Sequence, residues 1–196
     1  MKHEHILMIE DDPIHGDSIL EFLAKKIGGH DKVKWLYTES EFRSHVNEIK
    51  AGKQPVPDLV ISDVMLPWCF AEEGRKGDVP KEVIEQTYRR AGTRCHSYFR
   101  ETQRGFSHIP WVYFTILDEE AIEYQFNSDS RTSHVKKEDG LPALWQRIEE
   151  FDKPEWDESE EEVTDRLLGN AKTKSQLLEA LKEDWKTSMV WKLSPA

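Results

Sequence analysis

The chain is predicted to fold as a doubly wound α/β domain around a parallel sheet. Two observations indicate this. Short apolar runs alternate with longer segments of helical periodicity, in the order β-α-β-α-β up to Pro67, and this alternation is typical of parallel βαβ units. The third run, residues 59–61, is rich in Val and Ile and bounded by turn residues, as expected for a strand buried on both faces of a sheet.

The predicted elements follow in order along the chain. The first helix has Asp12 as its N-cap and Pro13 at its first position, and Gly28 terminates it. His3 and His5 are expected at exposed positions beside the first strand. Strands are expected at residues 6–9, 33–37, 59–61, 110–114 and 134–135, and helices at 13–27, 39–49, 92–105, 117–124 and 141–151, with 128–133 a polar loop.

Two segments do not fit a minimal alternation of strands and helices. Residues 68–91 form a long connection after the third strand, in which Val79-Pro80 is expected to begin a short helix. Residues 153–196 begin with an acidic stretch and continue with two segments of helical periodicity. The tail is too small for a core of its own, so we expect it to pack on the main domain, residues 1–152, or on a second copy in a homodimer.

Bulk composition excludes several classes of function. The formal net charge of −11 argues against non-specific binding to nucleic acid or anionic membranes. No apolar stretch is long enough to span a bilayer, and the N-terminus lacks the apolar region of a signal peptide. We therefore expect a cytoplasmic protein. Cys69 and Cys95 lie far apart in the sequence and are expected to be free thiols.

Polar groups follow four of the predicted strands directly. Glu10 and Asp11 follow the first strand, Asp63 the third, Thr115 the fourth, and Lys136-Lys137 the fifth. If these strands are parallel, then acids, a hydroxyl and an ammonium group gather at one edge of the sheet, where open α/β sheets bind ligands. A carboxylate is a competent nucleophile for phosphoryl transfer, and carboxylate oxygens suit Mg²⁺.

This constellation resembles the receiver domain of two-component response regulators over about residues 4–151. The resemblance implies a flavodoxin-like sheet of order 2-1-3-4-5 and a phosphoryl group accepted on Asp63 from a histidine kinase or phosphotransfer protein. It also implies Mg²⁺ held by Glu10, Asp11, Asp63 and the main-chain carbonyl of Met65. Thr115 matches the hydroxyl that contacts the phosphoryl group. Lys137 matches the family lysine best, with Lys136 as the alternative.

The resemblance also implies a protein that is not an enzyme and that acts through contact with a downstream protein. His134 would take the place of the switch aromatic of the family, or be a half-buried strand residue. Three features depart from the family pattern. Ile116 replaces a small residue after the threonine, Glu138 replaces the proline after the lysine, and the insertion 68–91 precedes Gly92, which matches a glycine of the family. We expect the insertion to shape the site.

Three other functions are alternatives to a phospho-accepting receiver. A haloacid-dehalogenase-like phosphohydrolase needs an Asp-x-Asp pair after the first strand, whereas this chain has adjacent acids there. A DNA-binding regulator is disfavoured because the tail from Lys153 is acidic overall. A phosphorylation-independent interaction scaffold with a receiver fold is the main competitor, and it predicts that Asp63→Asn leaves partner binding intact.

Overall fold

The computed structural model describes residues 3–70, 79–86, 88–102, 106–122 and 130–152. The chain divides into two units, Met1–Asp152 and Lys153–Ala196. The second unit, for which a helical extension is predicted, lies outside the described residues. In the described ranges, no helix combines the length and hydropathy that crossing a bilayer requires.

Five parallel strands form one sheet in the order β2-β1-β3-β4-β5, which confirms the predicted topology. The strands are β1 Ile6–Ile9, β2 Val33–Leu36, β3 Leu59–Ser62, β4 Trp111–Thr115 and β5 Thr132–Lys136. The helices are α1 Pro13–Ile27, α2 Glu39–Lys50, α3 Lys81–Gln86, α4 Ala91–Thr102, α5 Glu119–Ile122 and α6 Gly140–Asp152. Short 3₁₀ turns are η1 His30–Lys32, η3 Tyr88–Arg90 and η6 Lys137–Asp139.

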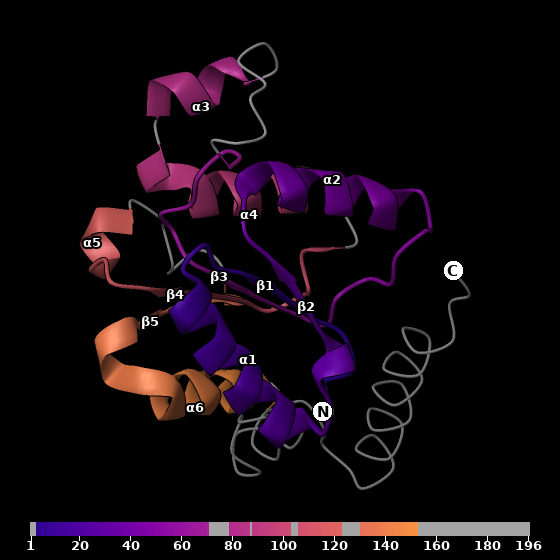
Figure 1. Ribbon diagram of the computed structural model, residues 1–196, viewed down its shortest axis with the longest axis vertical. Helices are drawn as coiled ribbons and strands as arrows, with labels where there is room; N and C mark the ends of the chain where they lie inside the picture. Colours follow the sequence, from indigo (N-terminus) through magenta and orange to yellow (C-terminus); the bar gives the residue numbers. More distant parts are fainter. Residues whose placement is uncertain (1–2, 71–78, 87, 103–105, 123–129, 153–196) are drawn as a thin grey trace, which may run out of the picture. The chain divides into compact units, whose positions relative to one another are not determined.

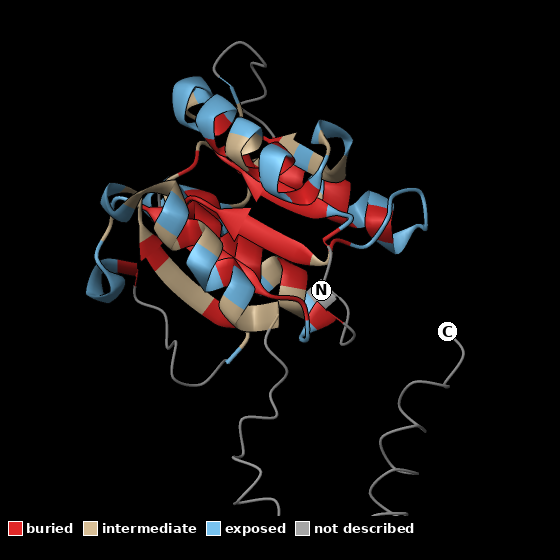
Figure 2. Cartoon of the chain, turned by 90° about the horizontal axis from the view of Figure 1, so that it is seen from below, coloured by how far each residue is buried: buried red, intermediate tan, exposed pale blue. Residues whose placement is uncertain are grey.

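Helices cover both faces of the sheet. Figure 1 shows α2 and α4 on one side of the strands and α1 and α6 on the other. Successive side chains of a strand point to opposite faces, so Leu7 and Ile9 join the core beneath α2 and α4, while Ile6 and Met8 join the core beneath α1 and α6. Every residue of β1, β3 and β4 is buried (Figure 2). Burial on both faces explains why these strands are continuous apolar runs.

Local signals fix the ends of the first two helices. The Asp12 side chain caps α1 by accepting hydrogen bonds from the N–H groups of Ile14 at 2.8 Å and His15 at 3.2 Å. Gly28 ends the helix with a φ of 82°, a left-handed conformation that favours glycine. Thr38 and Glu41 form a reciprocal capping box at the start of α2. These contacts place the loops after β1 and β2.

Several sequence expectations need correction. The segment 128–133 was expected to be a loop, but β5 begins at Thr132, whose side chain is buried. The helix expected at 117–124 is described only over Glu119–Ile122. His3 is 5% exposed rather than exposed, because its ring nitrogens lie 3.1 Å from Asp58 Oδ1 and 3.4 Å from Asp152 Oδ2. Cys69 and Cys95 are free thiols, as expected.

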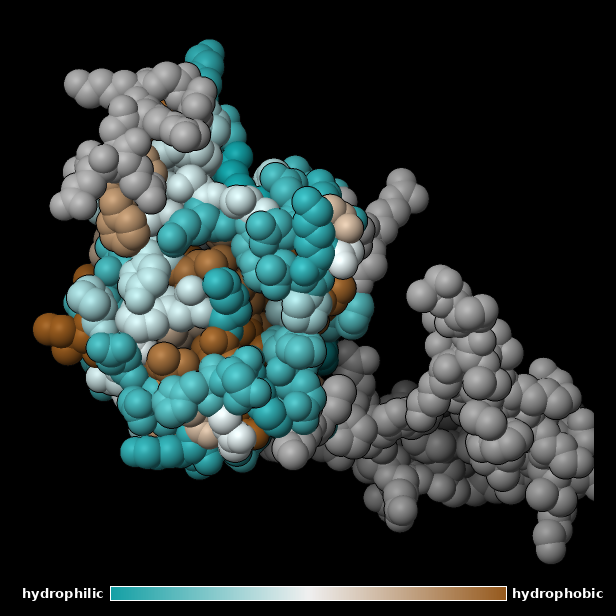
Figure 3. Space-filling view, turned by 45° about the vertical axis from the view of Figure 1, so that its right-hand side comes forward, coloured by the Kyte–Doolittle hydropathy of each residue, from teal (hydrophilic) through white to brown (hydrophobic). Residues whose placement is uncertain are grey.

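The segment after β3 includes residues 71–78, which lie outside the described residues. The described parts before and after them contact the rest of the domain or continue into its helices. At the start of the segment, Pro67 and Trp68 accept main-chain hydrogen bonds from Glu39 at 3.0 Å and Ser40 at 2.9 Å. Beyond it, α3 forms the short helix expected after Pro80, and η3 leads into α4. Hydrophilic side chains cover most of the described face that Figure 3 presents, around a smaller hydrophobic area.

Gly92→Ala is expected to lower the free energy of unfolding by about 1–3 kcal/mol, the usual cost of overpacking. A Cβ atom at Gly92 would lie 2.2 Å from the carbonyl oxygen of Asp63 and 2.7 Å from Cα of Val64. Both are main-chain atoms and cannot rotate away. Urea denaturation measures the loss, and Ser97→Ala, an exposed position on the same helix, is the control. Equal stability of the two variants would contradict the close approach.

Candidate functional site

The sheet brings the sequence-predicted residues Glu10, Asp63, Thr115 and Lys137 to one edge. Ile9 pairs with Ser62 and Thr115 with Lys136 in the parallel register, so the residues that follow these strands emerge at the same end. The Asp63 N–H donates to the Ile9 carbonyl at 2.9 Å, which extends the β1–β3 ladder by one residue. Glu10 is 2% exposed and Asp63 6% exposed, so both carboxylates are largely removed from water.

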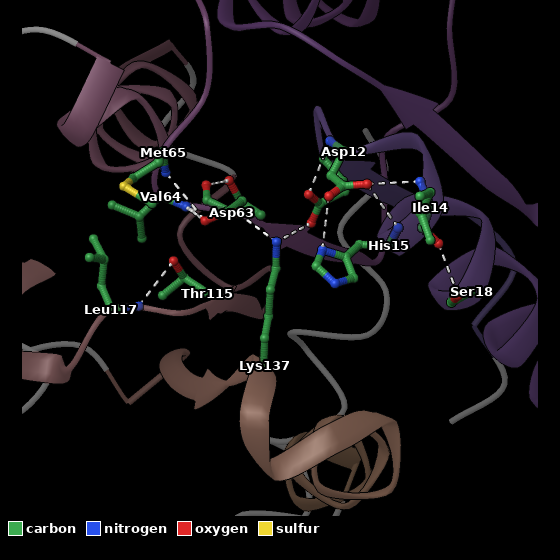
Figure 4. Close-up of polar contacts among 12 residues, drawn as sticks. Asp12, Ile14, His15, Ser18, Asp63, Val64, Met65, Thr115, Leu117 and Lys137 are labelled. Atoms are coloured by element: carbon green, nitrogen blue, oxygen red, sulfur yellow. Dashed lines mark hydrogen bonds and ion pairs between the residues drawn. The ribbon is translucent and has the colours of Figure 1, made fainter.

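Asp63 is held on both of its carboxylate oxygens. Oδ1 accepts hydrogen bonds from the main-chain N–H of Val64 at 2.5 Å and of Met65 at 3.2 Å. Oδ2 lies 2.6 Å from Nζ of Lys137 (Figure 4). Gly92 lies against the main chain of the same loop, and its N–H donates to the Val64 carbonyl at 2.9 Å. The direction of the Asp63 side chain is therefore set by its own loop, by α4 and by Lys137.

Lys137, and not Lys136, reaches the acidic residues. Its ammonium lies between Asp63 Oδ2 and Glu10 Oε2, at 2.6 Å and 2.7 Å. Burial alone would lower the pKa of Lys137, but the two carboxylates raise the pKa above its ordinary value. Lys136 pairs instead with Asp118 and with Glu138, the latter at 3.2 Å. Lys136 is the last residue of β5 and Lys137 the first residue of the 3₁₀ turn η6, so the two side chains point in different directions.

The acidic cluster carries more negative than positive charge. One carboxylate oxygen each of Glu10, Asp11 and Asp63 lies within 4.8 Å of the other two, and the Lys137 ammonium contacts Glu10 and Asp63. Burial raises the pKa of Glu10 from 4.5 to about 7, and the neighbouring Lys137 opposes the rise only in part. Burial likewise raises the pKa of Asp11. A divalent cation would balance this excess, and hard carboxylate oxygens are the ligands that Mg²⁺ prefers.

Thr115 and His134 both form a hydrogen bond with the main chain of Leu117. Thr115 is fully buried at the end of β4, and its Oγ1 accepts a hydrogen bond from the Leu117 N–H at 3.5 Å. In the part of the chain that the structure describes, no hydrogen bond joins Thr115 to Asp63. His134 is half-buried on β5, and its Nε2–H donates to the Leu117 carbonyl at 2.9 Å. Leu117 thus contacts both residues.

The cluster opens into a hollow of about 510 Å³. Glu10, Asp11, Asp63, Met65 and Lys137 line it, as does Ile116, which the sequence analysis expects beside Thr115. Five further residues line the hollow that the sequence analysis did not place there: Asp12, His15, Leu66, Pro67 and Tyr88. For Ile116, the adjacent Thr115 is a sequence signal. For Tyr88 the signal is the insertion 68–91 itself, which contains this residue and is expected to shape the site.

Trp35 is another residue that sequence reasoning missed. Its indole Nε1–H donates to the main-chain carbonyl of Glu10 at 2.8 Å, which fixes the chain where the acidic residues begin. A Cβ atom at Gly16 would lie 1.9 Å from the Trp35 ring, so the glycine makes room for it. The contact joins β2 to the loop after β1, and no local sequence pattern predicts it.

Solved structures share this architecture. The BeF3-activated N-terminal receiver domain of Klebsiella pneumoniae RstA matches with a TM-score of 0.50 and 21% identity, over 76% of this chain and 99% of that one. The phosphorylated cyanobacterial phytochrome response regulator RcpA matches with a TM-score of 0.51 and 16% identity, over 76% and 91%. The chain has the fold of a response-regulator receiver domain. A LuxR-family response regulator from an Aurantimonas species also matches, with a TM-score of 0.52 and 17% identity, over 76% and 84%.

No protein-family model matches the chain, and no curated protein matches it. At these identities the likeness establishes the receiver fold.

Proposed function

We propose that the chain is a phospho-accepting receiver of two-component signal transduction, with Asp63 as the acceptor. The observation that carries the proposal is the Asp63 carboxylate held 2.6 Å from the Lys137 ammonium, within the cluster of Glu10 and Asp11. The phosphodonor would be a histidine kinase or a phosphotransfer protein. A downstream protein would recognise the phosphorylated receiver domain, residues 1–152, and residues 153–196 would form an extension to it. The protein would act in the cytoplasm.

In the proposed reaction, a carboxylate oxygen of Asp63 attacks the phosphorus atom of a phosphohistidine. The new O–P bond forms as the N–P bond breaks, and the donor imidazole leaves with the bonding electron pair. Lys137 holds its ammonium beside Asp63 and can neutralise a phosphoryl oxygen. The hydroxyl of Thr115 can donate to another oxygen once the phosphoryl group is present. The domain then keeps the group, so it acts as a stoichiometric acceptor rather than as an enzyme that turns over.

Glu10, Asp11, Asp63 and the Met65 carbonyl would hold Mg²⁺ in this proposal. The bound ion would supply positive charge to the phosphoryl oxygens during transfer. The excess of carboxylates over ammonium groups supports this assignment, as does the raised pKa of Glu10, which reflects a buried acid lacking sufficient positive charge nearby.

The proposal is tested by intact-mass spectrometry after incubation with acetyl phosphate and Mg²⁺. The wild-type chain should gain one phosphoryl group and Asp63→Asn none. Asp12→Asn is the matched control, because Asp12 caps α1 and asparagine caps a helix equally well. If the wild-type chain gains nothing although it binds Mg²⁺, the acceptor role is wrong, and the receiver fold would serve as an interaction scaffold.

Mg²⁺ is expected to raise the melting temperature more at pH 8 than at pH 5.5. The pKa of Glu10 is about 7 in the folded chain against an ordinary value of 4.5. Between these values the folded state binds more protons than the unfolded state, so stability falls as the pH rises. Mg²⁺ competes with these protons and stabilises most where Glu10 is ionised.

At a concentration tenfold above its dissociation constant, Mg²⁺ should contribute about 1.4 kcal/mol, or a few degrees of melting temperature. Differential scanning fluorimetry with and without Mg²⁺ at both pH values measures the shift. Asp11→Asn combined with Asp63→Asn should abolish it. A shift of equal size in the double variant would show that the ion binds elsewhere.

A further inference from the structure

The inserted segment after β3 brings Tyr88 to the hollow that holds the proposed phosphorylation site. Tyr88, the first residue of η3, lines the same hollow as Asp63 and Lys137. The residue is 53% exposed. Packing in a buried core therefore does not explain a tyrosine at this position.

The main chain at Tyr88 is fixed to the loop that carries Asp63. The Tyr88 carbonyl accepts a hydrogen bond from the Leu66 N–H at 3.2 Å, and four residues later the Gly92 N–H donates to the Val64 carbonyl at 2.9 Å. The absence of a side chain at Gly92 lets α4 approach the Asp63 carbonyl closely. These two hydrogen bonds join η3 and the start of α4 to the loop after Asp63. They therefore fix the main chain of Tyr88 relative to Asp63.

Helix α2 braces the rest of the inserted segment through Arg43. The guanidinium lies 5.4 Å from the centre of the Trp68 ring, at the start of the segment, and pairs with Glu82 of α3 at 3.2 Å. It also pairs with the buried Glu39 at 2.8 Å. One side chain thus contacts both described parts of the insertion on either side of residues 71–78. Arg43 therefore anchors the inserted segment, which contains Tyr88, to α2.

Ile116 lines the hollow as well, from the end of β4, and is 64% exposed. Two large residues, an aromatic and a branched aliphatic one, therefore line the hollow that contains the acidic cluster. Hydrolysis of a phosphoryl group on Asp63 requires a water oxygen to approach phosphorus in line with the bond to the carboxylate. Apolar groups around a reacting centre exclude water.

We propose that the ring of Tyr88 shields a phosphoryl group on Asp63 from water and so lengthens its lifetime. This inference rests on the proposed function. In the step that the ring hinders, the water oxygen bonds to phosphorus while the O–P bond to Asp63 breaks. The carboxylate of Asp63 leaves, and the proton of the attacking water passes to solvent. Tyr88 does not take part in this chemistry and is a positioning residue that limits access.

The test compares the wild-type chain with Tyr88→Ala, Tyr88→Phe and Ile84→Ala. Each is charged with acetyl phosphate and Mg²⁺, the donor is removed, and intact-mass spectrometry follows the loss of the phosphoryl group. Tyr88→Ala should lose it roughly fivefold faster because water gains access, whereas Tyr88→Phe should match the wild type because the ring is retained. Ile84→Ala changes an exposed residue of α3 and should have no effect. The affinity for Mg²⁺ should be the same in all four.

The outcomes separate the inference from the function on which it rests. If the wild type charges and Tyr88→Ala loses the group at the wild-type rate, the shielding role is wrong and the acceptor role stands. If Tyr88→Phe hydrolyses as fast as Tyr88→Ala, the hydroxyl and not the ring is responsible, which also overturns the inference. If the wild type does not charge at all, the proposed function fails and the inference falls with it.

Discussion

Lys137→Met is expected to slow phosphoryl uptake by Asp63 about a hundredfold, the usual effect of removing one stabilising group from a site where charge develops. The Lys137 ammonium lies 2.6 Å from Asp63 Oδ2, where an oxygen of the incoming phosphoryl group needs a cation. The same change should tighten Mg²⁺ binding, because the ammonium competes with the metal for the carboxylates of Asp63 and Glu10. A slower rate combined with tighter metal binding distinguishes a role in the transfer from a general loss of structure.

Lys136→Met is the matched control. The two lysines are adjacent, but Lys136 pairs with Asp118 and Glu138 outside the hollow. Exposed pairs of this kind contribute little to stability, so the variant should take up the phosphoryl group at the wild-type rate. The rate is measured by intact-mass spectrometry at several times after addition of acetyl phosphate. A slow Lys136→Met with a normal Lys137→Met would reverse the assignment of the two residues.

The sequence alone does not distinguish the roles of the adjacent residues Lys136 and Lys137. The position of the fifth strand followed from a weak apolar signal at His134 and Val135, and either lysine could have ended it. In the structure Lys136 is the last strand residue and pairs in register with Thr115, and Lys137 begins a 3₁₀ turn. The strand also extends back to Thr132, because this threonine is buried and its Oγ1 lies 3.1 Å from His96 Nε2. A polar residue buried through a distant partner leaves no local apolar pattern.

The strands and helices around the site were predictable because their signals are local. Continuous apolar runs identified β1, β3 and β4, and the Asp12 cap and Gly28 fixed the ends of α1. The acids, Thr115 and the lysines could be grouped because parallel strands end at one edge of a sheet. Tyr88, Trp35 and the buried contacts of His3 could not be predicted this way, since each depends on chain segments far apart in the sequence.

Glu39→Gln is expected to lower the free energy of unfolding by about 3 kcal/mol, the scale of breaking a buried ion pair on one side only. The Glu39 side chain is fully buried at the start of α2. The Arg94 Nε lies 3.1 Å from each of its carboxylate oxygens, and Arg43 Nη2 lies 2.8 Å from Oε1. Removing the charge leaves two guanidinium groups without the carboxylate that they share, in a place where water replaces it poorly.

Urea denaturation measures this loss, and Glu48→Gln on the exposed face of α2 should change stability little. Glu39→Met with Arg94→Met should recover part of the loss of Glu39→Met alone, because the double variant no longer buries the Arg94 charge. If Glu39→Gln were as stable as Glu48→Gln, the pair would not hold α2 against α4. Arg43, which pairs with the Glu39 carboxylate, also contacts the segment after β3. The same variant should therefore shorten the lifetime of a phosphoryl group on Asp63 if the inserted segment shields it. A destabilised variant with an unchanged lifetime would separate the stability of the domain from the access that Tyr88 controls.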